Sequence, residues 1–122
     1  MKKLLLAAAA ALALNTAWAH GPAPAKHGGI VRSASEVGFE LVRQPDGALL
    51  YLDDHDAPIP SDNVRGKLTV LNGADKSEAE LKPAGANRLE AKGVTLKPGA
   101  KVVATVTLPG SKVITVRFNV AK

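Results

Sequence analysis

The sequence has no cysteine and few aromatic residues, and both absences limit what the protein can do. Without cysteine it has no thiolate metal ligand, no redox pair and no cysteine-linked lipid anchor, so packing rather than disulfides must stabilise it. Apart from Trp18, the aromatic residues are Phe39, Tyr51 and Phe118, too few for a surface that stacks sugars or bases. Basic residues are spread along the chain, which does not indicate a nucleic-acid partner.

Catalytic motifs are missing as well. The sequence contains neither a GxSxG nucleophile motif nor a glycine-rich phosphate-binding loop. Its three histidines, His20, His27 and His55, fall in predicted arm or loop segments. Nothing near them indicates a nucleophile with a positioned base and an oxyanion hole. We therefore expect a protein that is not an enzyme.

Long hydrophobic runs are absent except at the N-terminus, where residues 1–19 are typical of a secretory signal peptide. Lys2 and Lys3 precede an apolar stretch, residues 4–14, and Ala17-Trp18-Ala19 has the small residues of a cleavage site. The apolar stretch is shorter than the roughly 20 residues of a membrane span. The prediction is a soluble protein exported to a bacterial periplasm, without a membrane anchor, whose cleaved chain begins at His20.

The remaining chain predicts a short arm and one β domain. Residues 20–29 (HGPAPAKHGG) are predicted to form a flexible N-terminal arm. In residues 30–122, alternating apolar and polar residues predict strands at 37–42, 48–52, 67–71, 77–81, 88–91, 102–108 and 113–120. Asp46-Gly47 and Asn72-Gly73 indicate hairpin turns, and 53–63 is predicted to be a loop. The whole predicts an antiparallel β-sandwich of about seven or eight strands with immunoglobulin-like topology.

An Asp-Asp-His-Asp sequence directly after the predicted strand 48–52 is the first candidate metal site. Imidazole and carboxylate groups are suitable ligands for Cu(II), Zn(II) and Ni(II). If the strand continued, Asp53 and His55 would share one face, and Asp54 and Asp56 the other. The alternative is a solvated acidic turn. A calcium-stabilised loop that adds Asp62 is a weaker alternative, because EF-hand spacing is absent.

Two histidines of the predicted arm are further candidate ligands. As the first residue of the cleaved chain, His20 would chelate a metal through its α-amine and imidazole. Pro22 has no N–H to extend this chelate, so the other ligands would come from Asp53 and His55 if the arm folds back. His27 precedes Gly28-Gly29, which suits a ligand at a sheet edge and equally an ordinary linker. The candidate set for a Cu or Zn ion is His20, His27, Asp53, His55 and Asp56.

Three segments resemble small periplasmic domains associated with heavy-metal efflux: His27-Gly28-Gly29, Phe39-Glu40-Leu41-Val42 and residues 50–56. Similar segments occur near the N-terminus of periplasmic adaptor subunits of metal-exporting pumps, and the resemblance covers roughly residues 27–70. CopC-type copper carriers, which use a mature N-terminal histidine with a D-x-H pair, offer a more distant chemical analogy. The resemblance implies a metal-binding accessory protein that buffers copper or another heavy metal, or hands it to an efflux system.

A non-metal interaction module is the alternative function. Such a module would offer an edge strand or a loop to a partner in the bacterial envelope. Glu40 lies on the strand face opposite Phe39 and Leu41 and is interpreted as a surface residue, with membership of a site as the alternative. The metal hypothesis requires neutral imidazoles, so binding should weaken below about pH 6. The sequence leaves the oligomeric state open.

Overall fold

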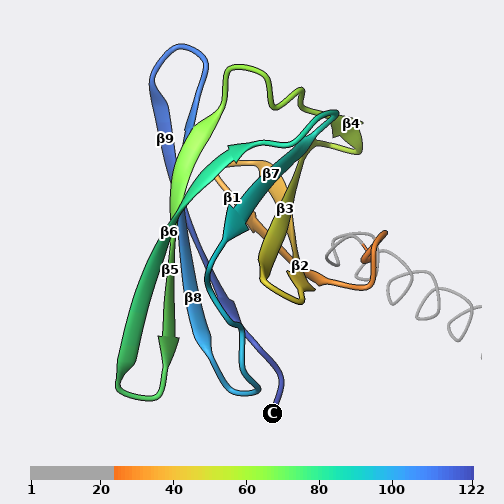
Figure 1. Cartoon of the computed structure of the whole chain (residues 1–122). Helices are drawn as coiled ribbons and strands as arrows, with labels where there is room; N and C mark the ends of the chain where they lie inside the picture. The colour runs from red at the N-terminus through yellow and green to blue at the C-terminus, as the bar shows by residue number, and fades with distance from the viewer. Residues whose placement is uncertain (1–23) are drawn as a thin grey trace, which may run out of the picture.

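The computed structural model describes residues 24–122, whose regular structure consists of β-strands (Figure 1). The strands are β1 (Ile30–Ala34), β2 (Val37–Gln44), β3 (Gly47–Asp54), β4 (Ala57–Pro58), β5 (Arg65–Asn72), β6 (Asp75–Pro83), β7 (Arg88–Lys92), β8 (Lys101–Leu108) and β9 (Lys112–Asn119). Within this range no helix has the length and apolar character needed to cross a membrane. The predicted signal peptide and His20 lie outside the described residues.

The strands pair antiparallel in the order β1-β2-β3-β7-β6-β5-β8-β9, with the short β4 attached to β3. Strand β6 belongs to two sheets, because its residues 75–81 pair with β5 while Lys82 and Pro83 pair with β7. The first and last strands of the order, β1 and β9, approach each other. The two sheets therefore form a sandwich that is nearly closed into a barrel (Figure 1).

The predicted all-β antiparallel fold is confirmed. The seven predicted strands correspond to β2, β3 and β5 to β9, whereas β1 was not predicted and β4 lies in the predicted loop 53–63. The strand order differs from the immunoglobulin arrangement, in which the second and third strands belong to different sheets. Here β1, β2 and β3 are neighbours in one sheet. Strands β5 to β8 form a Greek key instead, since β8 returns to pair with β5.

The hydrophobic core lies between the two sheets and is made by alternate residues of the strands. In β8, for example, Val102, Ala104 and Val106 are buried while the residues between them are partly exposed. The largest fully buried side chains include Phe39, Phe118, Leu41, Leu50, Leu52, Leu68, Leu81, Leu89 and Ile114. Each such side chain stabilises the fold by about 1.5–3 kcal/mol through removal of apolar surface from water. Packing therefore replaces the missing disulfides.

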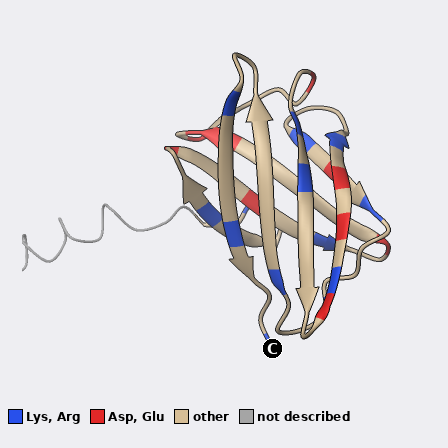
Figure 2. Ribbon diagram, turned by 90° about the vertical axis from the view of Figure 1, so that its left-hand side faces the viewer, with Lys and Arg blue, Asp and Glu red and all other residues tan. Residues whose placement is uncertain are grey.

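Charged residues of both signs are interspersed along the strands (Figure 2). Two lysines approach Glu78 of β6. The Nζ atoms of Lys67 on β5 and of Lys76 on β6 lie 3.3 and 3.7 Å from its Oε2. These side chains are about half exposed, and exposed ion pairs of this kind contribute only about 0–1 kcal/mol each. They keep the surface mixed in charge and add little to stability.

The pairing of β2 with β3 places two polar residues side by side on the outer face. Phe39 and Leu41 face the core, so the residue between them, Glu40, faces outward. Glu40 pairs with Val31 of β1 on one side and with Tyr51 of β3 on the other. The segment that precedes β1 lies over this Glu40–Tyr51 pair.

Candidate functional site

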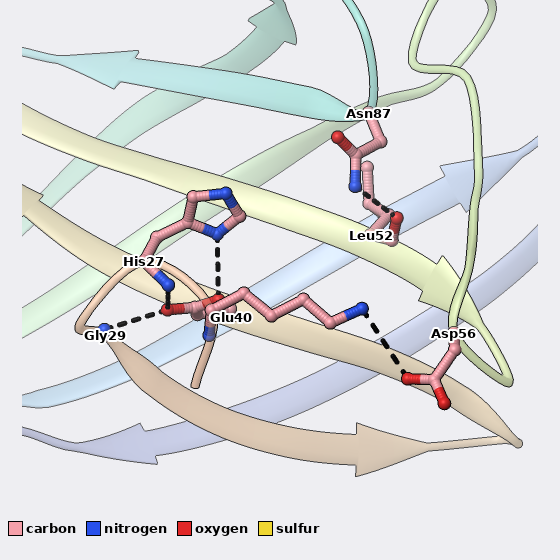
Figure 3. A network of polar contacts seen from close by, with 7 residues as sticks. His27, Gly29, Glu40, Leu52, Asp56 and Asn87 are labelled. Atoms are coloured by element: carbon pink, nitrogen blue, oxygen red, sulfur yellow. Dashed lines mark hydrogen bonds and ion pairs between the residues drawn. The ribbon is translucent and has the colours of Figure 1, made fainter. Parts of the chain in front are cut away.

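Glu40 is a buried carboxylate at the centre of the site, only 6% exposed although it is on the outer face of its sheet. Residues 26–29, which we call the N-terminal strap, cover it (Figure 3). Its Oε1 accepts a hydrogen bond from the Lys26 N–H at 3.1 Å and lies 3.0 Å from His27 Nδ1. Its Oε2 accepts from the N–H groups of His27 and Gly29, both at 2.8 Å. The interpretation of Glu40 as an exposed surface residue is therefore wrong.

The pKa of Glu40 is set by two opposing effects. Burial by itself raises it, because a charged group loses hydration. The hydrogen bonds from the Gly29 N–H, the His27 ring, the His27 N–H and the Lys26 N–H stabilise the charged form, and together they hold the pKa of Glu40 below its ordinary value. The carboxylate is therefore ionised at neutral pH, and the strap supplies its solvation in place of water.

The His27 ring is held on two sides. It stacks on the ring of Tyr51, with centroids 3.7 Å apart and planes 7° from parallel. Its Nδ1 faces Glu40, and its other nitrogen, Nε2, points away from that carboxylate (Figure 3). The side chain remains 40% exposed. One ring nitrogen thus faces the carboxylate, and the other lies on the far side of the ring from it (Figure 3).

The two glycines of the strap allow its close approach to the sheet. Gly28 has φ = +73°, a conformation that side chains other than glycine rarely adopt. A Cβ at Gly29 would overlap the Leu41 carbonyl oxygen. Lys26 adds an exposed ion pair with Asp56, in which Nζ and Oδ1 are 3.5 Å apart. The described part of the predicted flexible arm is therefore attached to the sheet at residues 26–29.

His55 lies in the tight turn between β3 and β4 rather than in a continuing strand. His55 and Asp56 have φ values of +51° and +71°, as in the two-residue type I′ turns that connect twisted hairpin strands. The His55 ring contacts Asp54, with Nδ1 2.6 Å from Oδ1, and its side chain is 78% exposed. The predicted sharing of one strand face by Asp53 and His55 is therefore wrong, because strand geometry ends before His55.

Three predicted ligands nevertheless surround one hollow. Its volume is about 240 Å³, and it is lined by Val31, Ser33, Glu36, Gly38, Asp53, His55 and Asp56. The absence of a side chain at Gly38 gives the Asp53 carboxylate its place, since a Cβ there would overlap Asp53 Oδ1. His27 does not line this hollow. Among residues 24–122 no group of three or more His, Asp or Glu side chains has an arrangement that could hold a metal ion.

The predicted ligands thus divide into three groups. His27 lies over Glu40 and Tyr51, and Asp53, His55 and Asp56 surround the adjacent hollow. The Lys26–Asp56 ion pair links the two places, whereas His20 precedes the described residues.

Comparison with known proteins leaves the site to be interpreted from its geometry alone. No family model, no curated protein and no solved structure matches the chain. The resemblance to metal-efflux domains therefore stays a prediction from short segments. Two of those segments, His27-Gly28-Gly29 and the one containing Glu40, are in direct contact in the structure.

Proposed function

We propose that the chain is a periplasmic metal-binding accessory protein that buffers copper or another heavy-metal ion, or hands it to an efflux system. The observation that carries this proposal is the His27–Glu40 pair. A buried carboxylate contacts Nδ1 at 3.0 Å while Nε2 points away from it. Histidines that ligate metals almost always donate their other ring N–H to a carboxylate, a carbonyl or water. The 3.0 Å contact between His27 Nδ1 and Glu40 Oε1 is compatible with this arrangement.

A second imidazole–carboxylate pair supports the proposal. His55 contacts Asp54 through the same ring nitrogen, Nδ1, and shares a hollow with Asp53 and Asp56. Carboxylate oxygens and imidazole nitrogens suit Cu(II) and Zn(II). We assign His27 as the first ligand and Asp53, His55 and Asp56 as the adjacent set. His20 is the proposed ligand from the preceding chain.

A site with few protein ligands suits buffering or hand-over better than permanent storage. A structural metal site is normally closed by four protein ligands, whereas an open site keeps positions for water or another molecule. In an open site, the proposed ion would keep exchangeable positions that a receiving protein could fill. The signal-peptide pattern of residues 1–19 supports export to the periplasm.

The test is a calorimetric titration of the signal-cleaved protein with Cu(II) and with Zn(II), its N-terminus verified by intact mass. Tyr51 is the only tyrosine of the sequence, and its stacking on His27 makes its fluorescence a local reporter of Cu(II). We expect one site, quenching of Tyr51 emission, and loss of both in His27→Ala. His55→Ala, the matched histidine variant, should weaken binding less. Association in the millimolar range only would contradict the proposal and favour the interaction module.

A further inference from the structure

We propose that Glu40 is a positioning residue that selects the Nδ1–H tautomer of the His27 ring and so leaves the Nε2 lone pair directed away from Glu40. A neutral imidazole carries its proton on one nitrogen and presents the other as an acceptor. Only an unprotonated nitrogen can bind a metal. The inference rests on the proposed function where it concerns metals, but the tautomer itself is a property of the metal-free protein.

The hydrogen-bond capacity of the carboxylate carries the argument. An ionised carboxylate has about four acceptor positions and no proton to donate. The N–H groups of Lys26, His27 and Gly29 occupy three of them, and His27 Nδ1 faces the fourth at 3.0 Å. If Nδ1 were unprotonated, its lone pair would face the lone pairs of Oε1. The proton is therefore on Nδ1.

Neither partner can turn away easily. Both N–H groups that donate to Oε2, those of His27 and Gly29, belong to the strap backbone. Rotation of the Glu40 carboxylate out of its plane would break these hydrogen bonds. The His27 ring is fixed in plane by its stacking on Tyr51, and a ring flip would place a C–H group against Oε1. Glu40 itself has no acceptor position left for a metal ion. Its role is to orient the ring rather than to bind the ion.

Nitrogen-15 NMR of the metal-free, signal-cleaved protein at about pH 8 tests the tautomer directly. Long-range proton–nitrogen correlations distinguish the two nitrogens of the His27 ring, and the signals that disappear in His27→Gln assign them. We expect a protonated Nδ1 and an unprotonated Nε2. In Glu40→Gln, the amide oxygen can still accept from the N–H groups of His27 and Gly29. Its NH₂ group then faces Nδ1 as a donor, so the tautomer should invert to Nε2–H.

Glu78→Gln is the matched control, because Glu78 is an exposed glutamate on β6 whose partner is Lys67; it should leave the His27 tautomer unchanged. A protonated Nε2 in the wild-type protein, or no inversion in a folded Glu40→Gln variant, would overturn the proposal. If that variant does not fold, the wild-type tautomer alone decides the question.

Metal binding gives a second, separable measurement. Loss of the orienting carboxylate should weaken Zn(II) binding by about 10- to 100-fold in Glu40→Gln, while Glu78→Gln should bind as the wild type does. Unchanged Zn(II) affinity in a folded Glu40→Gln variant would overturn the positioning role. If the wild-type ring has the expected tautomer but binds Zn(II) and Cu(II) only weakly, the proposed function fails while tautomer selection by Glu40 stands.

Discussion

Replacement of Glu40 by alanine should release the N-terminal strap without unfolding the barrel. Glu40 is the common acceptor of the strap's N–H groups, at residues 26, 27 and 29. None of the strap residues belongs to the hydrophobic core. Once the carboxylate is gone, the strap N–H groups would be buried without partners, which is more costly than their exposure to water. The strap is therefore expected to leave the sheet.

The free energy by which the attached strap stabilises the protein is the sum of two opposing contributions. A hydrogen bond to a charged group contributes about 1.5–3 kcal/mol, so the four contacts of Glu40 supply roughly 6–12 kcal/mol. Ordering the backbone of the four strap residues costs roughly 4–8 kcal/mol. The midpoints of these two ranges leave a net stability of the attached strap of about 3 kcal/mol, and we take about 2–4 kcal/mol as its working range. For a domain of this size that corresponds to a fall in Tm of roughly 10–20 °C.

Limited trypsin digestion measures the release, because Lys26 lies within the strap and precedes His27. A loss of 2–4 kcal/mol raises the population of the detached strap, and hence cleavage after Lys26, by roughly 30- to 700-fold. Intact mass spectrometry identifies the cut. The control is Glu78→Ala, which removes an exposed carboxylate and should lower Tm by no more than a few degrees. If Glu40→Ala is cleaved at the wild-type rate and has the wild-type Tm, the conclusion that Glu40 holds the strap on the sheet is refuted.

Three further predictions concern the same segment. The folded-state pKa of Glu40 lies below its ordinary value of 4.5, so its contribution is complete above about pH 4.5 and is lost as the pH falls through the folded pKa. The protection of the Gly29 amide against hydrogen exchange, corrected for the intrinsic exchange rate, should therefore be kept from pH 7 to 5 and be lost only in more acidic solution. Gly29→Ala should detach the strap, because the added Cβ would overlap the backbone of Leu41. In Gly38→Ala the added Cβ would meet the movable Asp53 side chain, so Tm should fall by no more than a few degrees. Equal effects of the two substitutions would contradict this reasoning. A chain that begins at Ile30 should keep the β-sheet circular dichroism of the barrel but lose the metal affinity assigned to His27, and collapse of its β signal would show that the strap is part of the folding unit.

Sequence patterns predict most of the fold because the core side chains alternate along the strands. The segment 102–108 shows this plainly, since its buried residues occupy every second position. Strand β1 is harder to predict: Arg32 and Ser33 are exposed and none of its residues is fully buried. Strand order is harder still, because pairing between β3 and β7 joins residues about 40 apart by tertiary packing, not by a local turn.

The site is less predictable than the fold because it depends on a contact across the sequence. The alternation in β2 correctly places Glu40 on the outer face, and an outward glutamate is ordinarily solvated. Its burial arises from residues 26–29, which carry no hydrophobic pattern that would indicate packing on a sheet. The usable signal is the Gly28-Gly29 pair, since adjacent glycines allow a backbone to approach another closely. Likewise, the type I′ turn at His55 and Asp56 lacks the usual glycine or asparagine, so the end of β3 is not evident from the residues.

Fold and site are therefore built from different parts of the chain. The barrel is stabilised by side chains from residue 37 onward, whereas the orientation of His27 depends on backbone groups before residue 30 that bind one buried carboxylate. Burying an ionised glutamate is unfavourable unless its hydrogen bonds replace water, and here they come from the strap that carries the histidine. Loss of the strap would expose Glu40 to solvent, and loss of Glu40 would free the strap. Each half of the site thus maintains the other, while the hydrophobic core of the barrel includes neither.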